Sequence, residues 1–197
     1  LAVNTTSSAV HEEFELKGKT IDLDLPSGPY LRGEIKNGSL TLEALGQSLS
    51  GNLLFEQATD ASGDELIRLA ATEVSLSLGD GETDYVSVSG GAALFLLSRG
   101  AGSQTVAGVV SGTVAANIPG VSVAGTLLFE FNQGAAAVNE IFQVHGDQAE
   151  LNLPGGPFVR VAGTNVELTV LGQQVSGNYV FQKTADPQRV VLIGTSV

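Results

Sequence analysis

One long internal repeat constrains the fold of this chain more than any other feature. Residues 25–32 read LPSGPYLR and residues 153–160 read LPGGPFVR, an offset of 153 − 25 = 128. At this offset, 9–32 matches 137–160 with 11 identities in 24 positions. Repeated units usually stack to extend a surface, whereas catalytic sites rarely come in such arrays. The repeat therefore favours a structural role.

A second match fixes the extent of the unit. Residues 46–56 (GQSLSGNLLFE) resemble 172–182 (GQQVSGNYVFQ) at an offset of 172 − 46 = 126. We therefore divide the chain into a first β-repeat unit, 1–128, and a partial second unit, 129–197, that continues from it. Because both ends align with the interior of a unit, we expect a piece of a longer chain, or a subunit whose register continues into a neighbour.

Composition narrows the classes of partner. The net charge is −12 with only nine Lys and Arg residues, so a nucleic-acid ligand is not expected. The absence of cysteine excludes a disulfide framework. No apolar run approaches the roughly 20 residues that span a bilayer, so we expect no membrane span. The 25 glycines and the low charge density favour strands and tight turns over helices.

Apolar and polar residues alternate along most of the chain, which is typical of β-strands. Residues 11–26 alternate apart from one slip near Gly18, which we interpret as a β-bulge. Asn37-Gly38 lies between two alternating runs and predicts a two-residue hairpin loop, with Arg32 opposite Glu43. In the second unit, Gly163-Thr164 is the corresponding loop.

The second hairpin is two residues shorter, and an even-numbered deletion keeps every side chain on its face. It predicts that Arg160 faces Glu167. Further turns are expected at Pro26–Pro29, Gly90-Gly91, Pro119-Gly120 and Pro154–Pro157. The predicted fold is all-β, with antiparallel hairpins in an elongated two-sheet sandwich or flattened tube built from tandem repeats. A β-solenoid is the alternative, although no short coil period is present.

No catalytic constellation stands out. His11 and His145 are not equivalent under the repeat, and neither has an expected partner for acid–base or zinc chemistry. Ser-Gly occurs at 50–51, 111–112 and 176–177 without a nucleophile elbow, so we expect glycines at strand bends. Asp22 and Asp24 share one strand face and suggest a glycan hydrolase, but we expect no such enzyme activity.

Two acidic turns are the candidate metal sites. Asp80, Glu82 and Asp84 alternate in one glycine-containing turn, as carboxylates often do in calcium loops. Asp60 and Asp64 form the second candidate. A solvated acidic turn is the alternative interpretation, and calcium is the one cofactor that these residues suggest.

Three turn and strand motifs carry a resemblance to a known class of protein. They are LSGNLLFEQ at 49–57, LPSGPYLR at 25–32 and IPGVSVAGT at 118–126. Together they resemble the long β-rich tandem repeats of giant bacterial extracellular proteins, the adhesin-like or haemolysin-type calcium-binding polypeptides. The resemblance implies an extracellular or cell-surface location in a bacterium, a structural or adhesive role, and calcium.

We therefore expect a non-enzymatic module that stacks end to end into a rod or fibre. Its expected partners are neighbouring repeats or identical subunits, joined by sheet extension. A calcium- or carbohydrate-binding module, with a glycan or surface as its partner, is the alternative.

Overall fold

The computed structural model describes residues 1–42, 47–60, 62–80, 82–100, 103–185 and 188–195. These residues form strands, turns and bends, and contain no helix. The strands are β1 (Ala2–Asn4), β2 (Val10–Leu16), β3 (Lys19–Leu25), β4 (Tyr30–Leu42), β5 (Gln47–Thr59), β6 (Glu65–Gly79), β7 (Asp84–Gly100), β8 (Ser103–Ile118), β9 (Val121–Asn132), β10 (Val138–Val144), β11 (Asp147–Leu153), β12 (Phe158–Val170), β13 (Gln173–Ala185) and β14 (Gln188–Thr195).

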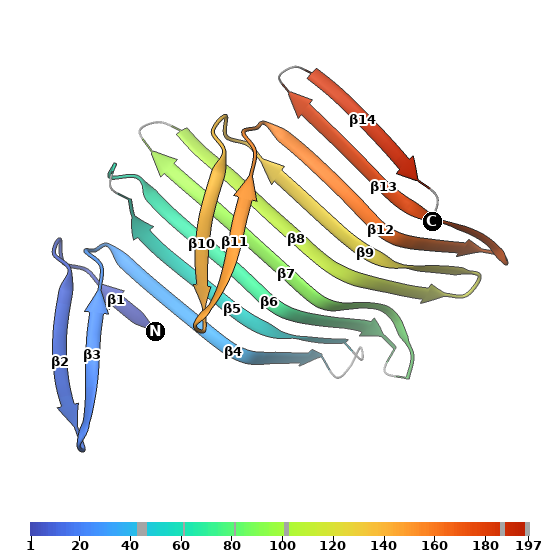
Figure 1. The fold of residues 1–197 in the computed structure, drawn as a ribbon. Helices are drawn as coiled ribbons and strands as arrows, with labels where there is room; N and C mark the ends of the chain where they lie inside the picture. Colours follow the sequence, from blue (N-terminus) through green and yellow to red (C-terminus); the bar gives the residue numbers. More distant parts are fainter. Residues whose placement is uncertain (43–46, 61, 81, 101–102, 186–187, 196–197) are drawn as a thin grey trace.

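Most strands belong to one large antiparallel sheet (Figure 1). Within the described residues, ten strands follow the order β1-β4-β5-β6-β7-β8-β9-β12-β13-β14, and the sheet does not close on itself. Two hairpins, β2–β3 and β10–β11, stand outside it. The predicted all-β, antiparallel class is confirmed.

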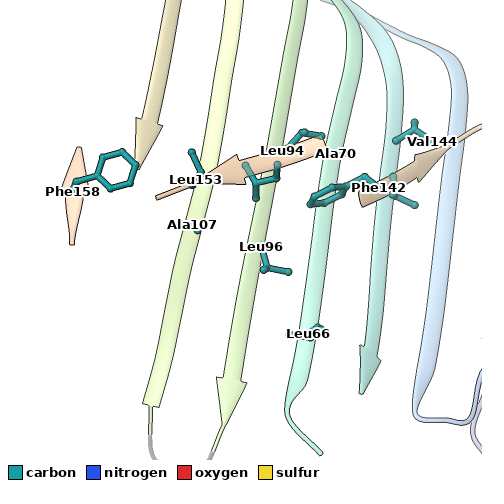
Figure 2. Packing of buried hydrophobic residues seen from close by; sticks show 11 residues of the cluster. Leu66, Ala70, Leu94, Leu96, Ala107, Phe142, Val144, Leu153 and Phe158 are labelled. Carbon is teal, nitrogen blue, oxygen red and sulfur yellow. The ribbon is translucent and has the colours of Figure 1, made fainter. Parts of the chain in front are cut away.

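Hairpin β10–β11 leaves the sheet between β9 and β12 and crosses one face of the preceding strands (Figure 1). Phe142, Val144 and Leu153 point from the hairpin onto the sheet (Figure 2), and Leu151 belongs to the same buried cluster. Phe142 and Leu151 are each 1% exposed. This contact forms the hydrophobic core, with Leu54, Leu66, Ala70, Leu94, Leu96, Ala107 and Phe158 on the sheet side.

A line of β-bulges crosses the large sheet, where several strands change direction. The register shifts lie after Ile35 in β4, near Glu73 in β6, near Gly90 in β7 and after Gly163 in β12. A residue with positive φ lies at each: Asn37 (49°), Glu73 (54°), Gly90 (58°) and Asn165 (50°). An extra residue on one strand of a pair bends that strand. The bulges therefore bend the sheet at one level.

The Asn37-Gly38 hairpin prediction is wrong. Both residues lie inside β4, which continues to Leu42 and pairs with β5, with Gly38 opposite Gly51. Asn-Gly allows positive φ, and a bulge needs that conformation as much as a tight turn does. Arg32 pairs with Glu56, not with Glu43, which lies outside the described residues.

The second unit repeats this correction. Gly163-Thr164 is part of β12, and the sheet shifts register at this point. Arg160 lies opposite Glu130 of β9 and donates a hydrogen bond to its Oε2 atom, so Glu167 is not its partner. The predicted Gly90-Gly91 turn is likewise wrong, because both glycines lie inside β7.

The true tight turns lie elsewhere. The β-bulge predicted near Gly18 is wrong, because Lys17-Gly18 is a two-residue turn, with φ values of 50° and 74°, that joins β2 to β3. His145-Gly146 is the equivalent turn between β10 and β11. Positive φ at both central residues is the type I′ geometry of two-residue hairpins. The predicted turn at Pro119-Gly120 is confirmed between β8 and β9.

Candidate docking surfaces

The two hairpins are equivalent in sequence but differ in burial. Phe14 of β2 corresponds to Phe142 of β10 at the 128-residue offset. Phe142 is 1% exposed within the core, whereas Phe14 is 51% exposed. Leu16 and Ile21 on the same side of β2–β3 are 59% and 46% exposed. Hairpin β2–β3 thus presents an uncovered apolar side.

Equivalent asparagines anchor the bases of both hairpins. Asn132 is 1% exposed, and its Nδ2 donates to the carbonyls of Ala136 and Pro154. Asn4 is 4% exposed, and its Nδ2 donates to the carbonyls of Ser8 and Pro26. Each amide thus holds the start and the end of one hairpin. Hairpin β2–β3 is therefore held for the same crossing path as β10–β11.

Close backbone contact explains the glycine in the LPxGP motif. A Cβ on Gly156 would lie 2.1 Å from the Asn132 carbonyl oxygen, and a Cβ on Gly28 would lie 2.1 Å from that of Asn4. Only glycine fits such an approach. The motif that reveals the repeat is thus the base of the hairpin.

Charged residues fasten β10–β11 to the sheet beside the apolar core. Arg68 lies 2.9 Å from Glu56 Oε1 and 3.1 Å from Glu140 Oε2 of the hairpin. Glu56 Oε2 lies 2.6 Å from Arg32, which also pairs with Glu34 at 2.7 Å. These five side chains form a charged strip that joins β4, β5 and β6 to the hairpin.

The turn of the hairpin also binds this strip. Glu34 accepts a hydrogen bond from the His145 amide at 3.1 Å, and Arg32 donates to the Gln143 carbonyl. Burial alone would raise the pKa of Glu34, but the His145 amide and Arg32 outweigh it and lower that pKa. Burial and the Glu56 carboxylate raise the pKa of Tyr30. The side chain of Glu34 therefore stays ionised beneath the turn.

The opposite face of the large sheet is apolar and uncovered. We call it the open face and define it by two rows of paired residues. One row crosses the sheet as Ile35, Leu53, Ala71, Ala93, Val110, Phe129, Val161, Phe181 and Leu192. The adjacent row is Gly33, Phe55, Leu69, Phe95, Gly108, Phe131, Val159, Lys183 and Val190. Soluble monomers rarely expose an apolar patch of this extent.

Two hollows lie in the open face. One of about 630 Å³ is lined mainly by apolar residues of β4 to β7, including Leu53, Phe55 and Phe95. The other, of about 480 Å³, lies between β9, β12 and β13, with Phe129, Phe131 and Lys183 in its wall. Both volumes fall within the range of ligand pockets, which is about 300–1,000 Å³.

The predicted calcium residues Asp80, Glu82 and Asp84 lie at the β6–β7 turn. Asp80 Oδ1 accepts hydrogen bonds from the amides of Glu82 (3.0 Å) and Thr83 (2.8 Å), and Oδ2 accepts one from the Tyr85 hydroxyl at 2.6 Å. These donors, the Tyr85 hydroxyl first, lower the pKa of Asp80 to about 2. Asp84 accepts a hydrogen bond from Ser77. In this turn the Asp80 carboxylate organises its own loop.

Asp60 and Asp64 lie in the β5–β6 turn, at the other end of β6 from Asp80. Asp60 Oδ1 accepts hydrogen bonds from the amides of Ser62 and Asp64. The structure therefore does not bring the two acidic turns together. Within the described ranges, no group of three or more His, Cys, Asp or Glu side chains is placed to hold a metal ion.

The histidines lie on different hairpins. His11 Nδ1 is 2.7 Å from Asp24 on the polar side of β2–β3, opposite the side that carries Phe14. Asp22 lies on the same polar side. His145 sits in the β10–β11 turn, and its Nε2 is the one buried side-chain polar atom without a hydrogen-bond partner among the described residues. They therefore form no shared site.

Sequence reasoning found the alternation that builds both apolar surfaces, but it expected such a face to be buried and missed that both are uncovered. A sequence signal for the two hairpin turns was present: Lys17-Gly18 and His145-Gly146 are glycine-containing dipeptides that lie 128 residues apart, at equivalent positions of the repeat. The described residues contain no helix that is long and apolar enough to cross a membrane. Comparisons with family models, curated proteins and solved structures give no match.

Proposed function

We propose that this chain is a non-enzymatic structural module of a bacterial extracellular or cell-surface protein, built to stack with further copies of its repeat unit. The unit is six sheet strands, β4–β9, followed by one crossing hairpin. The observation that carries the proposal is the difference in burial between Phe14 and Phe142, two equivalent residues of which only one is covered.

The covered hairpin supports the proposal that the uncovered one binds a further copy of the unit. Hairpin β10–β11 lies over the strands that precede it, with contacts to β5, β6, β7, β8 and β9. Hairpin β2–β3 leaves the sheet in the same way, between β1 and β4. Its apolar side therefore suits the equivalent strands of a preceding unit. There Glu12, the counterpart of Glu140, would face the position that Arg68 occupies in the first unit.

Both edges of the large sheet support the same proposal. Within the described residues, β1 and β14 each pair with one neighbour and leave their outer backbone groups free for another strand. Unpaired edges are templates for strand addition. Added strands would continue the sheet, and each hairpin would fasten one unit to the next.

Sedimentation velocity and small-angle scattering of the full chain test this proposal. We expect elongated oligomers whose size increases with protein concentration. The double variant Phe14→Ser with Ile21→Ser should weaken this association, because it removes apolar area from β2–β3 alone. Leu171→Ser is the control, since Leu171 is 84% exposed in the turn between β12 and β13. A compact monomer at all concentrations, or association that the double variant leaves intact, would contradict the proposal.

A further inference from the structure

We propose that the open face binds the hydrocarbon chain of an acyl lipid with an anionic head group. This inference does not depend on the stacking of units, since the open face lies on the other side of the sheet from the hairpin β10–β11. It rests on the two hollows of the face, on its chemistry and on the position of Lys183.

The open face is crowded where the sheet bends and hollowed beside that level. At the bulge level its positions are occupied by glycines, including Gly38, Gly112 and Gly163. A Cβ on Gly38 would lie 2.8 Å from Ile35 Cγ2, and a Cβ on Gly163 would lie 2.6 Å from Val166 Cγ2. Side chains therefore crowd together on this side where the sheet bends. The two hollows lie on the same side, so the face is a trough.

The chemistry of the trough suits hydrocarbon. The row from Ile35 to Leu192 contains only apolar side chains, and from Leu53 to Phe181 its residues pair with a neighbouring strand on both sides. A polar ligand would lose hydrogen bonds to water here without replacing them. An alkyl chain would instead remove apolar surface from water on both partners, at roughly 25 cal/mol per Å².

A second copy of the chain fits the trough less well. Two open faces placed together would enclose their hollows, which are about 480 and 630 Å³ on each copy. Protein interfaces are stable when they pack as densely as protein interiors, so voids of this size oppose such a dimer. A flexible alkyl chain adapts to an irregular hollow.

Lys183 supplies the preference for an anionic head group. It lies on β13 in the wall of the smaller hollow, where it carries the only charge among the lining residues. No ion pair joins Lys183 to another described residue. Its ammonium group is therefore free to pair with a carboxylate or phosphate while the alkyl chain lies against Phe129 and Phe131.

Binding of palmitate and hexadecanol to the full chain tests the inference by native mass spectrometry and fluorescence displacement. We expect both probes to bind the monomer. Phe129→Ser with Val161→Ser should weaken both by at least about tenfold, since each buried apolar side chain contributes on the order of tenfold. Lys183→Gln should weaken palmitate and spare hexadecanol. Phe14→Ser is the matched control and should leave both unchanged.

Two results would overturn the inference. One is a folded wild-type chain that binds neither probe. The other is a stable dimer that Phe129→Ser dissociates and palmitate does not, which would assign the open face to a second copy. Loss of stacking in the Phe14 variant with unchanged palmitate binding would separate this inference from the proposed function.

Discussion

Glu140 of hairpin β10–β11 pairs with Arg68 of β6, with 3.1 Å between the carboxylate oxygen and the guanidinium nitrogen. Arg68 also binds Glu56, so one guanidinium joins the hairpin to two neighbouring sheet strands. These side chains are largely shielded from water, at 18% exposure for Arg68 and 28% for Glu140. Together with the bonds from Glu34 and Arg32 to the hairpin turn, the pair therefore fixes the lateral position of the hairpin over the apolar core.

Removing this pair should destabilise the fold modestly. We expect Glu140→Gln to lower the free energy of unfolding by about 1 kcal/mol, because the pair is only partly buried. Urea denaturation measures the change. Glu12→Gln, the equivalent substitution on the exposed hairpin, should have no effect on the isolated chain. Equal effects of the two substitutions would contradict the role of the pair.

Phe142→Ala should destabilise the chain strongly. Phe142 is 1% exposed, and truncation of a buried phenylalanine costs about 3–5 kcal/mol. Phe14→Ala should cost much less, since Phe14 is already 51% exposed. Hydrogen exchange will show whether the loss is local, as amides of β10 and β11 should exchange faster. If the two substitutions cost the same, hairpin β10–β11 does not close the core.

The asparagine of the Ser-Gly-Asn motif should stabilise the fold more in the first unit, as Asn52, than in the second, as Asn178. Asn52 accepts a hydrogen bond from the Asn37 amide at the β4 bulge and donates one to Glu73 at the β6 bulge. Asn178 accepts only the equivalent bond from Asn165 among the bonds described.

We expect Asn52→Ala to lower the free energy of unfolding by about 1–3 kcal/mol, because it leaves the bulge amide without its partner. Asn178→Ala should cost less, and thermal denaturation of both variants compares them. A larger effect at Asn178 would mean that the bulges are held by other contacts.

Asp80 should titrate well below an ordinary aspartate. Its pKa is about 2 in the folded chain, against 3.8 for the unperturbed group. A lowered pKa in the folded state means that this group stabilises the fold above the unfolded value, and that the contribution fades as the pH falls from about 3.8 to about 2.

Nuclear magnetic resonance titration of the carboxyl carbon measures this pKa. Tyr85→Phe removes the largest cause, the Tyr85 hydroxyl bond, and should move the pKa of Asp80 upward. Tyr179→Phe is the control. An unchanged value in Tyr85→Phe would exclude that bond in solution.

Calcium should leave the melting temperature of this chain unchanged. Both Asp80 oxygens already accept hydrogen bonds from the turn, and Asp60 Oδ1 does the same in the other loop. A bound ion would have to displace these donors. Thermal melts with excess calcium and with EDTA make the comparison, and a clear upward shift with calcium would restore the calcium interpretation.

The sequence predicted the strands well because side-chain alternation is a local property. From Val110 to Ile118, apolar or glycine residues on one side of β8 alternate with Ser, Thr, Ala and Asn on the other, and the structure has a strand there. Asn4 and Asn132, which lie 128 residues apart, each hold the base of one hairpin.

Turn assignment failed where two structures need the same backbone conformation. Asn37 and Lys17 both have φ near 50°, yet one forms a bulge and the other a tight turn. The partner strand decides between them: β5 continues past Asn37, whereas β3 returns along β2. This choice depends on distant residues, so local signals could not settle it. The extent of the open face was missed for the same reason, since its rows join residues far apart in the chain.

The level of the bulges has a consequence for any longer assembly. Since the strands on both sides of β8 and β9 bend at one height, a new strand joined at either edge would meet neighbours that are already angled there. Adding strands at an edge would then lengthen the sheet across its strands while the bent cross-section stays the same. The length of the strands would set the width of the assembly, and the number of units alone would set its length.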